Sequence, residues 1–291
     1  MPPLKETNFP GLYQAADAKA KEAQQKHFLS VLGYSGLLLI ASLFAFWAKD
    51  PDPFFKFIAA GLFLLSLSLM IWQKTEKFEE VWYNARAVAE SVKTTTWRFM
   101  TKASPYEGVD AEADQLFRND IREILNQNEV LVRKLKAETA GAKAVSDTMK
   151  NARRLSLAER LQWYKTERIE DQQMWYSKKE DDNRRMGNRM FAIAIALHGL
   201  AIGLLLWNIK EPSLVLPVSV IGVATSAVLG WMQAKKYNEL ASSYSQTAHE
   251  ITLIKRDDDT IITEQQFSEY VLNCEAAFSR EHTQWVARKR K

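Results

Sequence analysis

The stretch MFAIAIALHGLAIGLLLWNI, residues 190–209, holds 20 consecutive positions without a charged side chain. A helix of this length is about 30 Å long, which matches the thickness of the hydrocarbon core of a membrane. Helices of a soluble bundle usually carry a polar stripe, and this run has none. It therefore predicts a membrane-spanning helix, although the whole chain has an ordinary composition with 47% hydrophobic and 25% charged residues.

Three further runs have the same character. Residues 28–48 hold no charge across 21 positions, and residues 214–232 hold none across 19. Residues 54–72 are interrupted only by Lys56, which lies in the first turn and can lift its ammonium group into the headgroups. We therefore predict an all-α membrane protein with four transmembrane helices, at about 28–48, 54–72, 190–209 and 214–232.

Basic residues gather on one side of these spans. They precede the first and third spans and follow the second and fourth, whereas the turns at 49–53 and 210–213 carry little positive charge. The positive-inside rule then places both termini and the long central segment in the cytoplasm, where the single cysteine, Cys274, would stay reduced. The net charge of +4 reflects these flanks, and without an interleaved basic and aromatic face we expect no nucleic-acid binding.

Tryptophans mark the ends of the spans twice in the same way. Trp47 and Trp207 close the first and third spans 160 residues apart, and Trp72 and Trp231 close the second and fourth 159 apart. Indole rings favour the membrane interface, so we assign all four as interface anchors. The constant offset predicts two parallel repeats, each a two-span hairpin with long cytoplasmic helical extensions.

Helix signals continue in the cytoplasmic segments. The stretches SLAE at 156–159 and TEQQ at 263–266 have the spacing of a capping box, which marks the start of a helix. No proline interrupts residues 157–209, so one long helix is expected to run from the cytoplasm through the third span. Gly187 is its one weak point in the sequence.

Small residues recur at helix-contact spacing in the third and fourth spans: Gly199, Gly203, Gly222, Ser226 and Gly230. Such spacing lets helix backbones approach closely. We predict that these faces either hold a hairpin together or join protomers.

A few polar residues in the spans are candidates for lining a pore or, for the histidine, for sensing pH: His198, Ser35, Ser66 and Thr225. An ionisable residue inside a membrane is a functional candidate, and histidine titrates near neutral pH. The alternative is structural, because hydroxyls in a span often bond their own backbone and a histidine can do the same. Leu38 or Leu39 stands at the position equivalent to His198 in the first repeat, so the repeat does not require the histidine.

Polar residues on the predicted cytoplasmic helices form two groups: Arg86, Glu90 and Lys93 in the first, and Arg160, Arg168, Gln172, Glu281 and His282 in the second. The first group shares one helix face, which predicts either a buried ion-pair network or solvated pairs that stabilise little. We expect the second group to form hydrogen bonds between helices. Neighbouring helix residues point in different directions, so the SREH stretch at 279–282 does not predict a catalytic site.

Motifs for catalysis or cofactor binding are absent from the sequence. It contains no P-loop, no glycine-rich dinucleotide loop and no His/Cys cluster with the spacing of metal ligands. We therefore expect no enzymatic activity, no cofactor and no metal.

Three stretches resemble a known family: MKNARRLSLAERLQWYKTERIEDQQMWYSKKEDDN at 149–183, FSEYVLNCEAAFSREHTQWVARKRK at 267–291, and ARAVAESVKTTTWRFMTKASPY at 85–106. They are similar to the SMODS- and SLOG-associating two-transmembrane effector (SLATT) domains, with one variety in each half. The resemblance implies a tandem protein with a first unit at 1–107, a helical connector at 108–150 and a second unit at 151–291.

The resemblance also implies a function. SLATT proteins are effectors of bacterial conflict systems, thought to perforate or depolarise the inner membrane so that an infected cell dies. They are often paired with nucleotide second-messenger synthases or sensors. A nucleotide second messenger or a soluble sensor protein is thus an expected partner, beside the lipid bilayer and further copies of the chain.

Two other functions are compatible with the sequence. The chain could be a non-conducting membrane scaffold or sensor that recruits a soluble partner through its helical cytoplasmic layer. A small transporter is the other alternative, although no span is broken at mid-depth and Pro217 lies only in the opening turn of the fourth. Four spans with short turns are too few for one protomer to enclose a wide aqueous path, so a pore would require oligomers.

Overall fold

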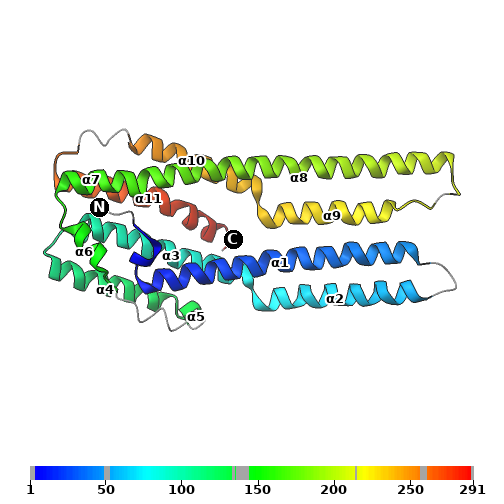
Figure 1. The fold of residues 1–291 in the computed structure, drawn as a ribbon, viewed down its shortest axis with the longest axis horizontal. Coiled ribbons are helices and arrows are strands. Elements are labelled where there is room, and N and C mark those ends of the chain that lie inside the picture. The colour runs from blue at the N-terminus through cyan, green and yellow to red at the C-terminus, as the bar shows by residue number, and fades with distance from the viewer. Residues whose placement is uncertain are drawn as a thin grey trace. The chain divides into compact units, whose positions relative to one another are not determined.

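The computed structural model describes residues 4–48, 53–132, 135, 144–213, 215–255 and 261–289, and the side chains of these residues except Val130, Val132 and those from 280 onward. Within these ranges the fold is all-helical, and no strand occurs (Figure 1). The predicted all-α class is therefore confirmed.

The helices follow one another in the order η1 (Glu6–Asn8), α1 (Gly11–Trp47), α2 (Phe54–Glu76), α3 (Phe78–Thr101), α4 (Asp110–Gln127), α5 (Glu129–Val132), α6 (Asp147–Arg153), α7 (Leu157–Tyr164), η3 (Lys165–Glu170), α8 (Asp171–Lys210), α9 (Val218–Lys235), α10 (Tyr237–Ile254) and α11 (Glu264–Lys289). η1 is a short 3₁₀-helix and η3 is a π-helix. Both predicted capping boxes are present. Ser156 and Glu159 exchange hydrogen bonds at the start of α7, and Thr263 and Gln266 do so before α11.

Two compact units divide the chain. The first comprises residues 1–23, 80–180 and 242–291, and the second comprises residues 24–79 and 181–241. The first unit contains a core of large aromatic side chains that are fully buried, among them Trp97, Phe99, Phe117, Tyr164 and Phe267. These side chains come from α3, α4, α7 and α11, which therefore share one hydrophobic core.

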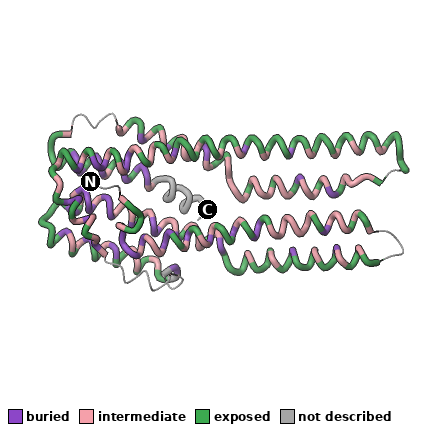
Figure 2. Tube along the Cα trace, in the orientation of Figure 1, coloured by how far each residue is buried: buried purple, intermediate pink, exposed green. Residues whose placement is uncertain are grey.

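The second unit is apolar but hardly buried (Figure 2). Three helical stretches, Gly11–Trp47, Phe54–Thr101 and Leu157–Lys210, are long and apolar enough to cross a membrane. Only 17%, 11% and 6% of their most apolar windows are buried, so most of that surface must meet a nonaqueous environment. The apolar surface thus indicates a membrane protein. α9 is not among these three helices, and the fourth span stays a prediction.

Close contacts join α1 to α2 in the second unit. Ser66 donates a hydrogen bond to the carbonyl oxygen of Tyr34 at 3.1 Å, and the Gln73 amide donates to Nδ1 of His27 at 3.3 Å. A Cβ added at Gly33 would lie 2.8 Å from Cδ2 of Leu69, so glycine permits the two helices to approach here.

The long helix predicted for residues 157–209 is present as a 54-residue helical run, Leu157–Lys210. The helix continues through Gly187, as expected of a run without a break. A Cβ added at Gly187 would lie 2.9 Å from Oδ1 of Asn238, so the glycine permits the start of α10 to pack closely against α8. The departure from α geometry occurs at Lys165–Glu170.

Candidate functional site

Three arginines are buried in the first unit along α6, α7 and η3. Arg153, Arg160 and Arg168 are each only 1% exposed. Arg153 ends α6 and Arg160 lies on α7, which is a separate helix, so it is the tertiary packing and not a single helix face that buries all three. Burying a guanidinium group costs much free energy unless the group is paired and hydrogen-bonded. The partners of these three arginines therefore identify the polar contacts on which the core depends.

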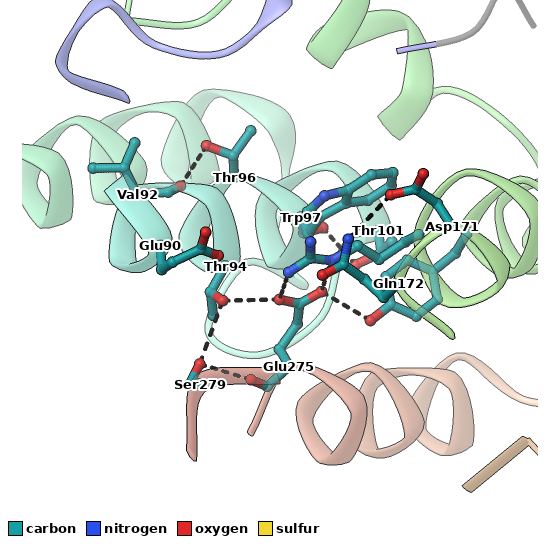
Figure 3. A network of polar contacts seen from close by, with 12 residues as sticks. Glu90, Val92, Thr94, Thr96, Trp97, Thr101, Asp171, Gln172, Glu275 and Ser279 are labelled. Carbon is teal, nitrogen blue, oxygen red and sulfur yellow. Dashed lines mark hydrogen bonds and ion pairs between the residues drawn. The ribbon is translucent and has the colours of Figure 1, made fainter. Parts of the chain in front are cut away.

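Arg168 forms a bidentate ion pair with Glu275 of α11, whose residue is also 1% exposed. Arg168 donates from Nε to Oε1 at 2.8 Å and from Nη2 to Oε2 at 2.7 Å. The Tyr164 hydroxyl donates to Oε1 at 3.0 Å, and Thr94 of α3 donates to Oε2 at 2.8 Å, so Glu275 accepts four hydrogen bonds (Figure 3). This carboxylate therefore connects α3, α7, η3 and α11.

The electrostatics of this site follow from burial and the ion pair. Burial, with the adjacent charge of Glu275, raises the pKa of the Tyr164 hydroxyl well above its ordinary value. The pKa of Arg168 is also raised: burial acts against the charged form, but the contact with Glu275 outweighs it. The tyrosine is thus a neutral donor and the arginine a permanent cation at physiological pH.

The other two arginines bind backbone carbonyls at the end of α3. Arg153 donates to the carbonyl oxygens of Phe99 at 2.6 Å and Tyr106 at 3.1 Å, and pairs with Asp110 at 3.0 Å. Arg160 donates to the carbonyl oxygen of Thr101 at 2.7 Å. The last carbonyls of a helix have no partner within the helix, so these guanidinium groups cap α3 from the side.

Aromatic rings surround the Arg168 guanidinium group, at 4.7 Å from the ring centre of Phe278 and 5.8 Å from that of Trp97. Trp97 also contacts Trp163, with ring centres 4.9 Å apart. Among the described residues, no hydrogen-bond acceptor meets Nη1 of Arg168 or the indole N–H of either tryptophan. In the described part of the chain, Glu275 thus accepts four hydrogen bonds at this site, and three further buried donor atoms meet no acceptor.

The first predicted polar group lies beside this site on α3. Arg86 forms ion pairs with Glu90 at 2.6 Å and with Asp17 of α1 at 3.2 Å. Lys93 has a lowered pKa, chiefly because burial disfavours its charge and secondly because of the nearby Arg168. The observed ion pairs favour a structural network over solvated pairs, and the role of these residues stays a prediction.

The second predicted group is brought together only in part. Arg160 and Arg168 point into the core, but Gln172 donates to its neighbour Asp171 at 3.0 Å (Figure 3). The side chains of Glu281 and His282 lie outside the described residues. Glu275 lies in the 267–291 stretch that resembles the SLATT closing helix but was not part of the predicted polar group, although it follows Cys274 and precedes Phe278 on the apolar face of α11. A charged residue on an apolar helix face was the signal that could have found it.

The polar candidates in the predicted spans mostly bond to backbone. Nδ1 of His198 lies 2.9 Å from the carbonyl oxygen of Ala194, which can only accept, so this nitrogen carries the proton. Thr225 donates to the Ile221 carbonyl at 2.9 Å. Ser66 bonds across to α1, and Ser35 is half-buried. His198 also lines an apolar groove of about 400 Å³, together with Phe191, Ala194, Ile195, Gly199, Ile202 and Leu229.

The small-residue faces are not where the helices of one chain meet. A Cβ added at Gly199, Gly203, Gly222 or Gly230 would have nothing within 4 Å. Ser226 is exposed and donates to the Gly222 carbonyl oxygen. Of the two predicted roles, holding a hairpin together is therefore not seen at these positions, and joining protomers stays a prediction.

The tryptophans differ in their surroundings. Three of them, Trp47, Trp72 and Trp207, are exposed, as expected of rings at a membrane interface. Trp231 packs against Phe28 with ring centres 5.7 Å apart and donates from its indole N–H to the hydroxyl of Tyr237 at 3.2 Å. Their assignment as anchors is a prediction that the exposure of the first three favours.

Comparison with known families covers nearly the whole chain. Residues 10–161 match the SMODS and SLOG-associating 2TM effector domain 3, and residues 164–285 match the SMODS and SLOG-associating 2TM effector domain 1. The predicted connector at 108–150 lies within the first of these ranges. No curated protein and no solved structure has significant similarity to the chain. The first match alone spans more than half of the sequence, and the chain therefore belongs to the SLATT family, with two SLATT domains in tandem.

Proposed function

We propose that this protein is a membrane effector of an anti-phage system that oligomerises and permeabilises or depolarises the bacterial inner membrane when a cytoplasmic signal arrives. SLATT domains are membrane effectors associated with conflict systems, which supports the general role. The proposed action on the membrane rests on one observation, the exposed apolar surface of the second unit. There the long helices are 6–17% buried in their most apolar stretches. In the proposed topology the chain crosses four times and both termini are cytoplasmic.

Oligomers are proposed because one chain has few spans and leaves small-residue faces open. The space around Gly199 and Gly203 on α8, and around Gly222 and Gly230 on α9, can accept a helix of another copy. Close helix approach in lipid depends on such faces because no hydrophobic force drives apolar helices together there.

The first unit is the proposed receiver of the signal. Its aromatic core and buried arginines make it a rigid helical layer, and the proposed trigger is a nucleotide second messenger or a soluble sensor protein. The proposed action is non-enzymatic. It requires only that the layer hold the assembly closed until the trigger binds.

Induced expression in bacteria with a membrane-potential dye tests this function. We expect depolarisation and loss of viability, and we expect Gly203→Leu with Gly222→Leu to suppress both by filling the open faces. Gly36→Leu with Gly61→Leu is the matched control, because these glycines are equally open but lie on α1 and α2. A wild-type chain that stays harmless, even when expressed with its neighbouring genes, and that co-purifies with a soluble protein would instead support the scaffold function.

A further inference from the structure

The long helix that begins at Leu157 changes its geometry at one place. Residues Lys165–Glu170 form the π-helix η3, between α7 and α8. A π-turn closes i→i+5 hydrogen bonds and accommodates one more residue than an α-turn. Such turns are rare and occur frequently at functional sites, so this one needs a physical reason.

Tertiary contacts to three other segments of the chain hold η3 in this geometry. Arg168 pairs with Glu275 of α11, as described above. The carboxylate of Glu167 accepts a hydrogen bond from the backbone N–H of Leu4 at 3.1 Å, and Glu170 lies 3.6 Å from the ammonium group of Lys255 beyond α10. Residues from the N-terminal segment and from the last third of the chain thus converge on these six residues.

The repeat gives η3 a definite position. The offset of 160 that relates Trp47 to Trp207 also relates Gly11, where α1 begins, to Asp171, where α8 begins. α8 of the second repeat is therefore the counterpart of α1 in the first. η3 lies directly before α8 and joins it to α7. α8 then continues without a break from the first unit into the second.

We propose that η3 is a register switch. Release of Glu275 from Arg168 lets the π-turn relax to α geometry, and the extra residue then joins the regular helix. One residue of an α-helix corresponds to about 100° of rotation and 1.5 Å of rise. α8 must then turn by about 100° relative to α7, and a continuous helix carries that turn into its apolar segment. This inference rests on the proposed function, because it supplies the step between signal and membrane.

The unsatisfied donors of the site support a switch over a static clamp. Nη1 of Arg168 is buried and meets no acceptor among the described residues. A fully satisfied buried network favours one arrangement. A network with an unsatisfied strong donor can gain a hydrogen bond in a second arrangement. Glu275 is the group whose removal frees both Arg168 and Tyr164, which flank the first half of η3.

A deletion separates this switch from a simple loss of stability. Removing Thr166, an exposed residue of η3, takes out the extra residue and leaves the flanking helices in their native positions. We expect ΔThr166 to fold with unchanged or higher thermal stability. We also expect α8 of this variant no longer to rotate relative to α7. Deletion of Lys178, an exposed residue in the regular part of α8, is the matched control and should disturb the register of everything after it.

The rotation of α8 is measured by the alkylation rates of single cysteines introduced at positions 177–189, in a Cys274→Ala background. We expect Glu275→Gln to shift the pattern of reactive positions by one residue, Tyr164→Phe to shift it partly, and ΔThr166 to abolish both shifts. A pattern unchanged in both substitutions, or a shift that persists with ΔThr166, overturns the proposal. A shift without depolarisation would contradict the proposed function and leave the switch standing.

Discussion

Lys77 and Lys236 adopt the same left-handed backbone conformation, with φ and ψ of 51° and 42° in one and 52° and 40° in the other. They lie 159 residues apart, the same offset that relates Trp72 to Trp231. Lys77 ends α2 and Lys236 ends α9, and each is followed by an aromatic residue that begins the next helix. The two halves of the chain therefore share this corner down to its backbone dihedral angles.

Replacing either lysine with glycine is expected to stabilise the protein. A side chain in the left-handed region costs about 1 kcal/mol, and glycine avoids that cost. We expect Lys77→Gly and Lys236→Gly each to raise the free energy of unfolding by up to about 1 kcal/mol, measured by thermal unfolding in detergent. Lys74→Gly, inside the last turn of α2, should instead lower it. A loss of stability at both corner positions would show that the lysine side chains matter more there than the backbone.

The ion pair of Arg168 and Glu275 is expected to show strong coupling. Removing one partner leaves a buried charge unpaired, which costs about 3–5 kcal/mol, whereas replacing both with apolar residues costs much less than the sum. We predict this pattern for Arg168→Met, Glu275→Leu and the double variant, from denaturant unfolding of the full chain. Arg185→Ala, which breaks an exposed pair with Asp182, should change stability by less than about 0.5 kcal/mol. Additive effects would mean that the pair is solvated in solution.

The features that could be predicted from the sequence are local ones. The apolar runs and both capping boxes depend on residues a few positions apart, and the structure contains them. Glu275 and Arg168 are 107 residues apart, so only the fold brings them together. The GxxxG spacing on α8 shows where helices are able to approach, and the close approaches occur at Gly33 and Gly187 instead. η3 left no signal in the sequence, because side-chain contacts from distant segments hold it.

Lys93 is expected to lower stability at neutral pH. Burial lowers its pKa in the folded protein, so the unfolded chain binds more protons between that pKa and the ordinary value of 10.5. Stability should therefore rise with pH through this interval. Lys93→Met should stabilise the protein at pH 7 and flatten the rise, measured by thermal unfolding between pH 7 and 10. Lys178→Met, at an exposed position of α8, is the control. A destabilised Lys93→Met variant would indicate that the ammonium group instead supports Glu90 or Glu275.

His198 is expected to be structural. Its Nδ1–H is satisfied by the Ala194 carbonyl of its own helix, and the first repeat has leucine at the equivalent position. His198→Leu should therefore leave membrane leakage unchanged from pH 5 to pH 8, measured with a potential-sensitive dye in cells or with vesicles containing the protein. His27→Leu is the contrasting variant, because His27 accepts a hydrogen bond from Gln73 of the neighbouring helix and its loss should weaken the contact of α1 with α2. Leakage that loses its pH dependence in His198→Leu would instead show that protonation of this ring, on the apolar groove beside Leu229, takes part in opening.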